Sequence, residues 1–316
     1  LMKNHLKLSI VIPVFNEAVN IRWHYGIVAD YLRSYRLDYE IIYVDDGSTD
    51  GSLKLIRQIH KQHPDKVRYI AFSRNFGKEA AVSAGIHQAK GDAAIIIDAD
   101  GQHPIELVGE FVKKWDDGFE VVIGLRKSNK GEGFTKKYGS KAFYWVLRLI
   151  NGRSGALPGS TDFRLIDRKV IDEYNKLTER NRMTRNLIDW LGFKQTIVPF
   201  AANERHAGKS AYSLRELVKL AINGVVAHST RPLKVISLLG VMISALSVVG
   251  TLFLVIEKYL LGDPMNLAVS GVAILALFLS FLVGVVLVCQ GLLALYLESV
   301  YHETQNRPLY VVKESS

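Results

Sequence analysis

Two long uncharged segments near the C-terminus constrain this chain more than any other feature of its sequence. Residues 235–256 form a run of 22 residues without a formal charge, and residues 267–297 form another of 31. As a helix, the first run would extend about 33 Å, enough to cross a hydrocarbon core of about 30 Å. The second is longer than one crossing needs, so part of it would tilt or lie in the interface. We therefore expect two transmembrane helices, the alternative being a buried helical hairpin in a large soluble protein.

Positive charge is concentrated before these apolar runs. The chain has 40 Lys and Arg against 31 Asp and Glu, a net charge of +9, and residues 1–234 hold 37 of the basic and 26 of the acidic residues. The connection at residues 257–266 has one Lys, whereas both flanks of the hairpin are richer in Lys and Arg, so the positive-inside rule places both termini in the cytoplasm. We expect a multi-pass protein of the cytoplasmic (inner) membrane.

The N-terminal part of the chain alternates between short β-rich runs and helical patterns. Apolar runs that suit buried strands lie at residues 8–14, 39–44, 67–72, 93–97 and 120–124. The helical patterns between them lie at residues 20–35, 52–62, 79–89 and 104–115. This alternation predicts an α/β domain built on a mostly parallel, Rossmann-like sheet.

Polar side chains follow three of the predicted strands. The first strand leads into Asn16 and Glu17, the second into the acidic turn at residues 45–50, and the fourth into residues 98–104. Ligands of such sheets bind beyond the carboxyl ends of the strands. We therefore expect the three strand ends to converge on one acidic crevice.

The segment DADGQHP at residues 98–104 offers oxygen ligands for a hard cation. Asp98, Asp100 and Gln102 follow one another at i, i+2 and i+4, a spacing that can direct them to one side of an extended segment. Mg²⁺ or Mn²⁺ is the expected cofactor, since it takes oxygen ligands and keeps positions open for substrate phosphates. The alternative is that these aspartates cap a following helix, which Pro104 at a helix start supports.

The turn DDGSTDGS at residues 45–52 is open to two interpretations. Its Asp and Ser side chains can satisfy local backbone groups, or they can contact a ligand at the end of a buried strand. The chain has neither the GxxxxGK[ST] phosphate loop nor a GxGxxG segment after the first strand. A nucleotide site here must therefore rely on carboxylates together with a metal ion.

Five segments together are similar to the motifs of family 2 glycosyltransferases. They are PVFNE (13–17), VDDGSTDGS (44–52), SRNFGKEAAVSAG (73–85), DADGQHP (98–104) and TDFRL (161–165). With its C-terminal hairpin, the chain resembles the polyprenyl-phosphate glycosyltransferases, the group that contains dolichol-phosphate mannose synthases and bactoprenol glucosyltransferases. The resemblance covers nearly the whole chain. It implies a GT-A catalytic domain followed by the two-helix transmembrane hairpin.

The resemblance also implies a division of the chain into four parts. A GT-A domain is expected at residues 1–202, and an acceptor loop with an interfacial amphipathic helix at 203–234. Two transmembrane helices are expected at 235–298, and a cytoplasmic tail at 299–316. The implied reaction is the inverting transfer of a hexose from a nucleotide sugar, with UDP-glucose or UDP-N-acetylglucosamine favoured, to polyprenyl phosphate.

Site residues carry over from the family one by one. The aspartate that contacts the nucleotide base maps best onto Asp46, with Asp45 as a neighbouring candidate, and the metal ligands map onto Asp98, Asp100 and Gln102. The expected nucleotide-sugar site consists of Pro13, Asn16, Glu17, Asp45, Asp46, Lys78, Asp98 and Ala99.

Asp162 and Asp100 are the candidates for a catalytic role. Asp162 maps onto the family's proposed base, but Ser160-Thr161 precedes it where the family has a glycine. A lipid monophosphate is already anionic near neutral pH, so positioning and leaving-group stabilisation can carry catalysis without a base. We therefore assign Asp162 to orienting the acceptor or donor. A structural salt bridge to Arg164 or Arg168 is the alternative.

Basic segments beside the membrane suit an anionic lipid acceptor. Residues 133–161 carry five basic and no acidic residues before Asp162, interleaved with apolar ones, which is typical of an interfacial helix. Residues 203–234 carry six basic residues against two acidic ones. By resemblance, the lipid-phosphate contacts are expected at Arg126, Lys136, Ser140, Arg205 and Lys209. A solvated basic helix face is the simpler alternative.

Three other classes of function fit the sequence less well. Nucleic acid is not an expected partner, because no recognition module accompanies the basic residues and these lie beside the apolar runs. A processive polysaccharide synthase of the same fold would carry a QxxRW motif, which is absent. A non-catalytic scaffold that binds sugar nucleotides and organises partners is the remaining alternative. Membrane lipids are expected partners, and small residues in the apolar runs would allow a homo-oligomer.

Overall fold

The computed structural model describes residues 7–35, 38–127, 160–180, 182–203 and 271–316, together with Met242, Leu246, Val249 and Ile256. The chain divides into two compact units. The first consists of the described residues up to Asn203 together with residues 306–316, and the second contains the described residues between them. Each unit is considered by itself.

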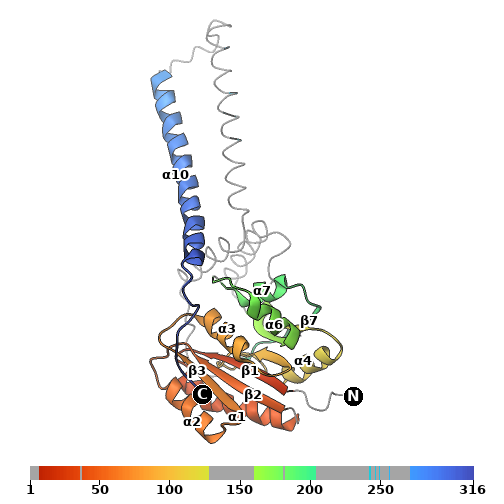
Figure 1. Ribbon diagram of the computed structural model, residues 1–316. Coiled ribbons are helices and arrows are strands. Elements are labelled where there is room, and N and C mark those ends of the chain that lie inside the picture. The colour runs from red at the N-terminus through yellow and green to blue at the C-terminus, as the bar shows by residue number, and fades with distance from the viewer. Residues whose placement is uncertain are drawn as a thin grey trace. The chain divides into compact units, whose positions relative to one another are not determined.

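A mixed sheet forms the centre of the first unit (Figure 1). Its eight strands are β1 (Lys7–Val14), β2 (Asp38–Asp45), β3 (Val67–Phe72), β4 (Ala93–Ile96), β5 (Val121–Arg126), β6 (Ser160–Asp167), β7 (Gln195–Phe200) and β8 (Val312–Ser315). They lie in the order β7-β5-β6-β4-β1-β2-β3-β8. Strands β3, β2, β1 and β4 are mutually parallel, whereas β6 and β8 run antiparallel to their neighbours. The predicted mostly parallel α/β sheet is confirmed.

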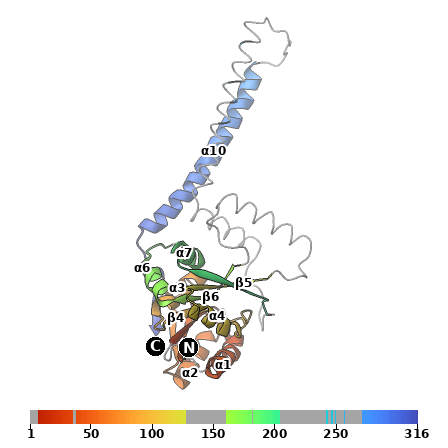
Figure 2. The ribbon, with the colours of Figure 1, turned by 90° about the vertical axis from the view of Figure 1, so that its right-hand side faces the viewer.

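Helices cover both faces of the sheet. They are α1 (Ala18–Ser34), α2 (Ser52–Gln62), α3 (Lys78–Gln88), α4 (Leu107–Asp116), α6 (Arg168–Lys176) and α7 (Thr184–Trp190). Successive side chains of a strand point to opposite faces, so Ile10 and Ile12 of β1 join a core with α1, α2 and α4, while Val11 joins a second core with α3, α6 and α7. Figure 2 shows these two helical layers in a second view. A sheet covered on both faces explains the continuously apolar strands.

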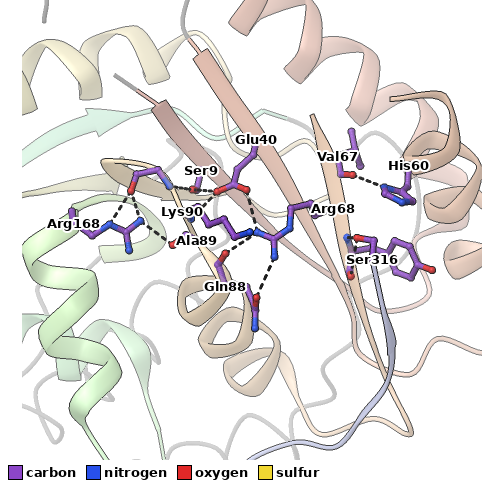
Figure 3. Close-up of polar contacts among 12 residues, drawn as sticks. Ser9, Glu40, His60, Val67, Arg68, Gln88, Ala89, Lys90, Arg168 and Ser316 are labelled. Carbon is purple, nitrogen blue, oxygen red and sulfur yellow. Dashed lines mark hydrogen bonds and ion pairs between the residues drawn. The ribbon is translucent and has the colours of Figure 1, made fainter. Parts of the chain in front are cut away.

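A buried polar network fixes the amino ends of the parallel strands (Figure 3). Glu40 of β2 is 2% exposed, and its Oε1 accepts hydrogen bonds from the Ser9 hydroxyl and the Lys90 backbone N–H, both at 2.7 Å. Arg68 donates to the other oxygen at 3.2 Å. Arg168, at the start of α6, donates to the carbonyls of Ala89 and Gly91. This end of the sheet is held together by side chains whose hydrogen bonds are made within the protein.

The last residues of the chain return to the sheet as β8. This strand pairs antiparallel with β3, and the Ser73 backbone N–H donates to the Val311 carbonyl at 3.0 Å. The Tyr310 ring stacks on Phe72 with centroids 4.8 Å apart, and Glu314 forms an ion pair with Arg57 of α2. This strand was not predicted, since residues 299–316 were expected to form a cytoplasmic tail. β8 therefore covers the edge that β3 would otherwise expose.

The second unit contains α10 (Gly271–Thr304), a helix of 34 residues that includes most of the second apolar run (Figure 1). Many of its exposed side chains are apolar, among them Leu275, Leu279, Val283 and Val286. Within the described parts of the chain, no helix combines the length and the apolarity required to cross a membrane. The first apolar run lies almost entirely outside the described residues, so the transmembrane hairpin stays a prediction.

Candidate active site

The loops after β1 and β2 are interlocked by short polar side chains. Asn16 has a φ of 55°, a left-handed conformation that asparagine tolerates better than most residues. Its Oδ1 accepts a hydrogen bond from the Thr49 N–H at 2.8 Å, and its own N–H donates to the Ser48 hydroxyl at 2.9 Å. The Glu17 N–H donates to the Ser52 hydroxyl at 2.9 Å. Asn16 and Glu17 thus follow β1 directly, and Asn16 holds the acidic turn after β2 in place.

Asp45 and Asp46, at the end of β2, are both buried but differ in their contacts. Asp46 accepts hydrogen bonds on both carboxylate oxygens, from the Phe76 N–H at 2.7 Å and the Gly77 N–H at 3.0 Å. Asp45 accepts one from the Ser48 N–H at 3.3 Å, while its Oδ1 is buried without a hydrogen-bond partner. Burial raises the pKa of the Asp45 carboxyl group and that of the Asp46 carboxyl group above the ordinary value for aspartate. Asp46 thus anchors the segment that leads into α3, and Asp45 keeps an oxygen that is not used within the protein.

Lys78, the first residue of α3, joins the carboxylate of Asp98, in the loop after β4, to that of Asp162 in β6. Its Nζ lies 2.7 Å from Asp98 Oδ1, 2.8 Å from Asp98 Oδ2 and 3.0 Å from Asp162 Oδ2. The antiparallel register of β4 and β6 pairs Ile96 with Arg164, so two residues further along it brings Asp98 opposite Asp162. Sheet topology therefore assembles this cluster from segments that are far apart in the sequence.

All three groups of the cluster are charged near neutral pH. Burial alone would lower the pKa of Lys78, but the charges of Asp98 and Asp162 raise it above its ordinary value. Burial would likewise raise the pKa of both carboxyl groups, yet the Lys78 ammonium holds that of Asp98 below its usual value. Lys78 and Arg185 together lower the pKa of Asp162 to about 2. One ammonium thus faces two carboxylates, which leaves a net negative charge.

His103 fixes the loop that carries Asp98. Its Nδ1 accepts a hydrogen bond from the Asp98 N–H at 3.1 Å, and its ring stacks on Phe163 of β6 with centroids 4.7 Å apart. Burial lowers the pKa of His103, and it lowers that of the nearby His24, on α1, to about 4. Both rings are therefore neutral near pH 7. The sequence predicted no specific contact for either ring, although His103 belongs to the DADGQHP motif.

The predicted metal ligands are only partly brought together. Asp100 is 7% exposed, and its Oδ1 accepts the Gln102 backbone N–H at 3.0 Å, a local contact like that of the capping alternative. Across the described residues, no group of three His, Cys, Asp or Glu side chains is arranged to hold a metal ion. Mg²⁺, however, is commonly bound by one or two carboxylates together with substrate phosphates. Asp98 already faces a cation, and Asp162 Oδ1 is buried without a hydrogen-bond partner, so the oxygen donors present are of the type that a divalent ion prefers.

Comparison with known proteins identifies the family. Residues 9–175, more than half of the chain, match the family model described as glycosyl transferase family 2. This chain belongs to that family. The family 2 enzyme is 39% identical over 318 residues to the glycosyltransferase YkcC of Bacillus subtilis (strain 168), a match that covers 99% of this chain and 95% of the relative.

A second relative has a more specific name. The SfII prophage-derived bactoprenol glucosyl transferase of Shigella flexneri is 34% identical over 312 residues, with 98% of each chain covered. Among solved structures, mannosyl-3-phosphoglycerate synthase from Rubrobacter xylanophilus superposes with a TM-score of 0.50 at 19% identity, covering 70% of this chain and 72% of its own. The enzyme is thus a glycosyltransferase with a GT-A-like fold.

Asp162 of the family 2 enzyme does not form the salt bridge to Arg164 or Arg168 that the sequence analysis considered. Arg164 is fully buried and pairs with Asp189 at 3.2 Å, and Arg168 lies 3.6 Å from Asp172. That alternative is wrong because both guanidinium groups are engaged by other carboxylates, and Asp162 pairs instead with the Lys78 ammonium at 3.0 Å. Arg164 still contributes positive charge to the surroundings of Asp162.

The remaining predicted site residues divide into two groups. Pro13 is buried in β1 opposite Val44, Ala99 is 3% exposed between the two aspartates of the motif, and Arg126 is an exposed residue at the end of β5. Four predicted lipid-phosphate contacts lie outside the described residues: Lys136, Ser140, Arg205 and Lys209. The acceptor side of the site therefore stays a prediction.

Proposed function

We propose that this family 2 glycosyltransferase transfers a hexose, with inversion at the anomeric carbon, from a nucleotide sugar to polyprenyl phosphate at the cytoplasmic face of the membrane. The observation that carries the proposal is the cluster of Lys78, Asp98 and Asp162, in which charged side chains converge beyond the carboxyl end of β4. A relative that matches 98% of the chain and is named as a bactoprenol glucosyl transferase supports the lipid acceptor.

The nucleotide is assigned to the ends of β1 and β2. Asp45 Oδ1 is a buried acceptor without a partner, which suits it to receive an N–H of the base. Asp46 would act indirectly, since its carboxylate holds the Phe76–Gly77 segment. UDP-glucose and UDP-N-acetylglucosamine are the favoured donors. The interlocked Asn16 and the acidic turn would keep this wall of the site rigid.

The sugar diphosphate is assigned to the loop after β4. With Mg²⁺ or Mn²⁺ bound, the site would have a positive charge against the diphosphate leaving group. Asp98 would hold the ion, with Asp100 and Gln102 as further predicted ligands. His103 orients this loop through the Asp98 backbone, and Lys78 supplies a cation that can reach the donor phosphates.

The acceptor needs no strong base, because a phosphate monoester is already anionic near neutral pH. Asp162 is therefore assigned a positioning role, in agreement with a pKa lowered to about 2, which makes it a weak base. Arg126, Lys136, Ser140, Arg205 and Lys209 are the proposed contacts of the lipid phosphate. Residues 235–298 are proposed as the membrane anchor, which the exposed apolar side chains of α10 support.

Radiolabelled transfer tests the proposal. The full chain in detergent would be incubated with polyprenyl phosphate, Mn²⁺ and a panel of labelled UDP-glucose, UDP-N-acetylglucosamine and GDP-mannose, and then extracted with organic solvent. Label in a lipid fraction that mild acid cleaves is the expected result. Label in a water-soluble polymer would identify a processive synthase, and nucleotide binding without any transfer would identify a scaffold.

A further inference from the structure

We propose that Lys78 takes the place of a divalent ion in the donor-free enzyme and has to leave Asp98 before a metal binds there. Lys78 would thus be a positioning residue that makes metal binding depend on the donor. This inference rests on the proposed metal dependence. It adds an order of events: Lys78 leaves Asp98, and the metal ion then binds there together with the donor.

The geometry leaves Asp98 no oxygen that is distant from the ammonium. Both carboxylate oxygens lie within 2.8 Å of Lys78 Nζ, which is hydrogen-bond distance. A divalent ion on either oxygen would lie beside a positive charge, and like charges at that separation repel strongly in a partly buried site. The ammonium and the ion therefore compete for the same carboxylate.

The other charged groups around the cluster have partners of their own. Arg164 pairs with Asp189 at 3.2 Å, and Arg185 donates to the Ser160 carbonyl at 3.5 Å. Glu79, next to Lys78, accepts the Thr184 N–H at 2.8 Å. Among the described residues, Lys78 is thus the cation that lies within hydrogen-bond distance of both Asp98 and Asp162.

Lys78 can move without losing all of its contacts. A lysine side chain has a flexible four-carbon stem and a compact charge with three donors. Once released from Asp98, the ammonium can remain with Asp162, whose Oδ2 lies 3.0 Å away, or turn to the donor diphosphate. The donor supplies negative charge that compensates both cations. Metal and nucleotide should therefore each strengthen the binding of the other, since such coupling is reciprocal.

Manganese binding in the absence of donor tests the inference. The full chain in detergent would be titrated with Mn²⁺ alone and the free ion followed by electron paramagnetic resonance. Lys78→Met, which removes the charge but keeps the length, should bind Mn²⁺ about tenfold more tightly than the wild type, within the usual range of coupling between sites. UDP should strengthen Mn²⁺ binding more in the wild type than in this variant.

Two further variants serve as controls. Lys66→Met removes another lysine that pairs with a carboxylate, since Lys66 Nζ lies 2.7 Å from Asp38 at the start of β2, and it should leave Mn²⁺ binding unchanged. Lys78→Arg keeps the cation and should bind Mn²⁺ as weakly as the wild type, which tests the inference even if Lys78→Met unfolds. Melting curves would establish that each variant is folded.

The outcomes separate this inference from the proposed function. Equal or weaker Mn²⁺ binding by Lys78→Met, with UDP still strengthening it, overturns the competition but leaves the metal dependence intact. Tighter binding by Lys78→Arg also overturns the competition. If no form of the protein binds Mn²⁺ with or without UDP, the proposed metal dependence fails and the inference fails with it.

Discussion

Strand β2 carries a buried carboxylate at each end, and the two differ in how their charge is satisfied. Glu40, near its start, is 2% exposed, and Ser9, Lys90 and Arg68 donate hydrogen bonds to its two oxygens (Figure 3). Burial would raise its pKa, but these contacts hold the pKa below its ordinary value. Asp45, at the end of the strand, is 1% exposed, has one oxygen without a partner and has a raised pKa.

Glu40 is fully hydrogen-bonded within the protein, whereas Asp45 is not, and this difference is the one expected between a structural carboxylate and one that binds a ligand. Buried polar groups are nearly always paired, and an unpaired one costs about 1–3 kcal/mol. At the amino end of the sheet the protein makes those hydrogen bonds itself. At the carboxyl end, Asp45 Oδ1 and Asp162 Oδ1 have no hydrogen-bond partner, and under the proposed function a bound substrate would offset that cost. The predictions below test this difference.

Replacing Asp98 should have the largest effect. Asp98→Asn removes the charge that holds Lys78 and that would hold the metal, so we expect transfer to fall by about a hundredfold or more, as for other groups that stabilise developing charge. The variant also loses the ion pair with Lys78, so its melting temperature should fall and the rates have to be referred to folded protein. Initial rates per amount of folded protein measure this, and a variant with near-normal turnover would remove Asp98 from the site.

Glu40 should show the opposite behaviour. Glu40→Gln introduces an amide N–H₂ among groups that are themselves donors, so we expect a loss of about 2 kcal/mol in unfolding free energy, with turnover per folded molecule unchanged. The matched control is Asp38→Asn on the same strand, which breaks the more exposed pair with Lys66 and should cost about 0–1 kcal/mol. Denaturant unfolding measures both. Equal losses of unfolding free energy in the two variants would show that the buried network around Glu40 stabilises the fold no more than the exposed ion pair does.

The charge of Asp162 should make the unfolding free energy depend on pH. Its pKa in the folded enzyme is about 2, below the ordinary 3.8, so its charge stabilises the fold at pH values above about 4. That contribution, up to about 2 kcal/mol, is lost as the pH falls from 4 towards 2. The difference in unfolding free energy between wild type and Asp162→Asn should therefore shrink across that window. A difference that is constant between pH 5 and 2 would show that Asp162 is not held by Lys78.

Adjacent aspartates should have different effects, smaller than those above. Asp45→Asn should raise the KM for the nucleotide sugar about tenfold, the equivalent of one hydrogen bond, with the melting temperature unchanged. Asp46→Asn should instead lower the melting temperature, because an amide cannot accept on both of its polar atoms from the Phe76 and Gly77 N–H groups. Steady-state kinetics and melting curves on both variants decide the matter. A raised KM in Asp46→Asn and a lowered melting temperature in Asp45→Asn would instead assign the contact with the nucleotide base to Asp46.

The elements of the fold that depend on local sequence patterns could be predicted from the sequence. Strands β1 to β5 and helices α1 to α4 were predicted within a few residues, because buried parallel strands are continuously apolar and their helices have a clear period. The later strands were not predicted. β8 has the polar sequence VKES, with mostly exposed side chains, and its position depends on hydrogen bonds to the edge of β3.

The sequence could propose the residues of the candidate site but not the contacts between them. Asp98, Lys78 and Asp162 each belong to a motif, yet only the antiparallel register of β4 and β6 brings the two aspartates to one ammonium. Likewise, Asp45 and Asp46 are equivalent as sequence letters. Which of them retains an unpaired oxygen depends on where the backbone of residues 76–77 passes, and that is a tertiary feature.

The most direct test of the account compares the two ends of the sheet in one assay. Wild type, Asp98→Asn and Glu40→Gln, each normalised to its folded fraction, would be given labelled UDP-glucose, or the donor selected from the panel, with polyprenyl phosphate and Mn²⁺. The account predicts that wild type and Glu40→Gln label the lipid at similar rates, while Asp98→Asn does not. Lipid labelling by Asp98→Asn at the wild-type rate, or an equal loss in both variants, would contradict it.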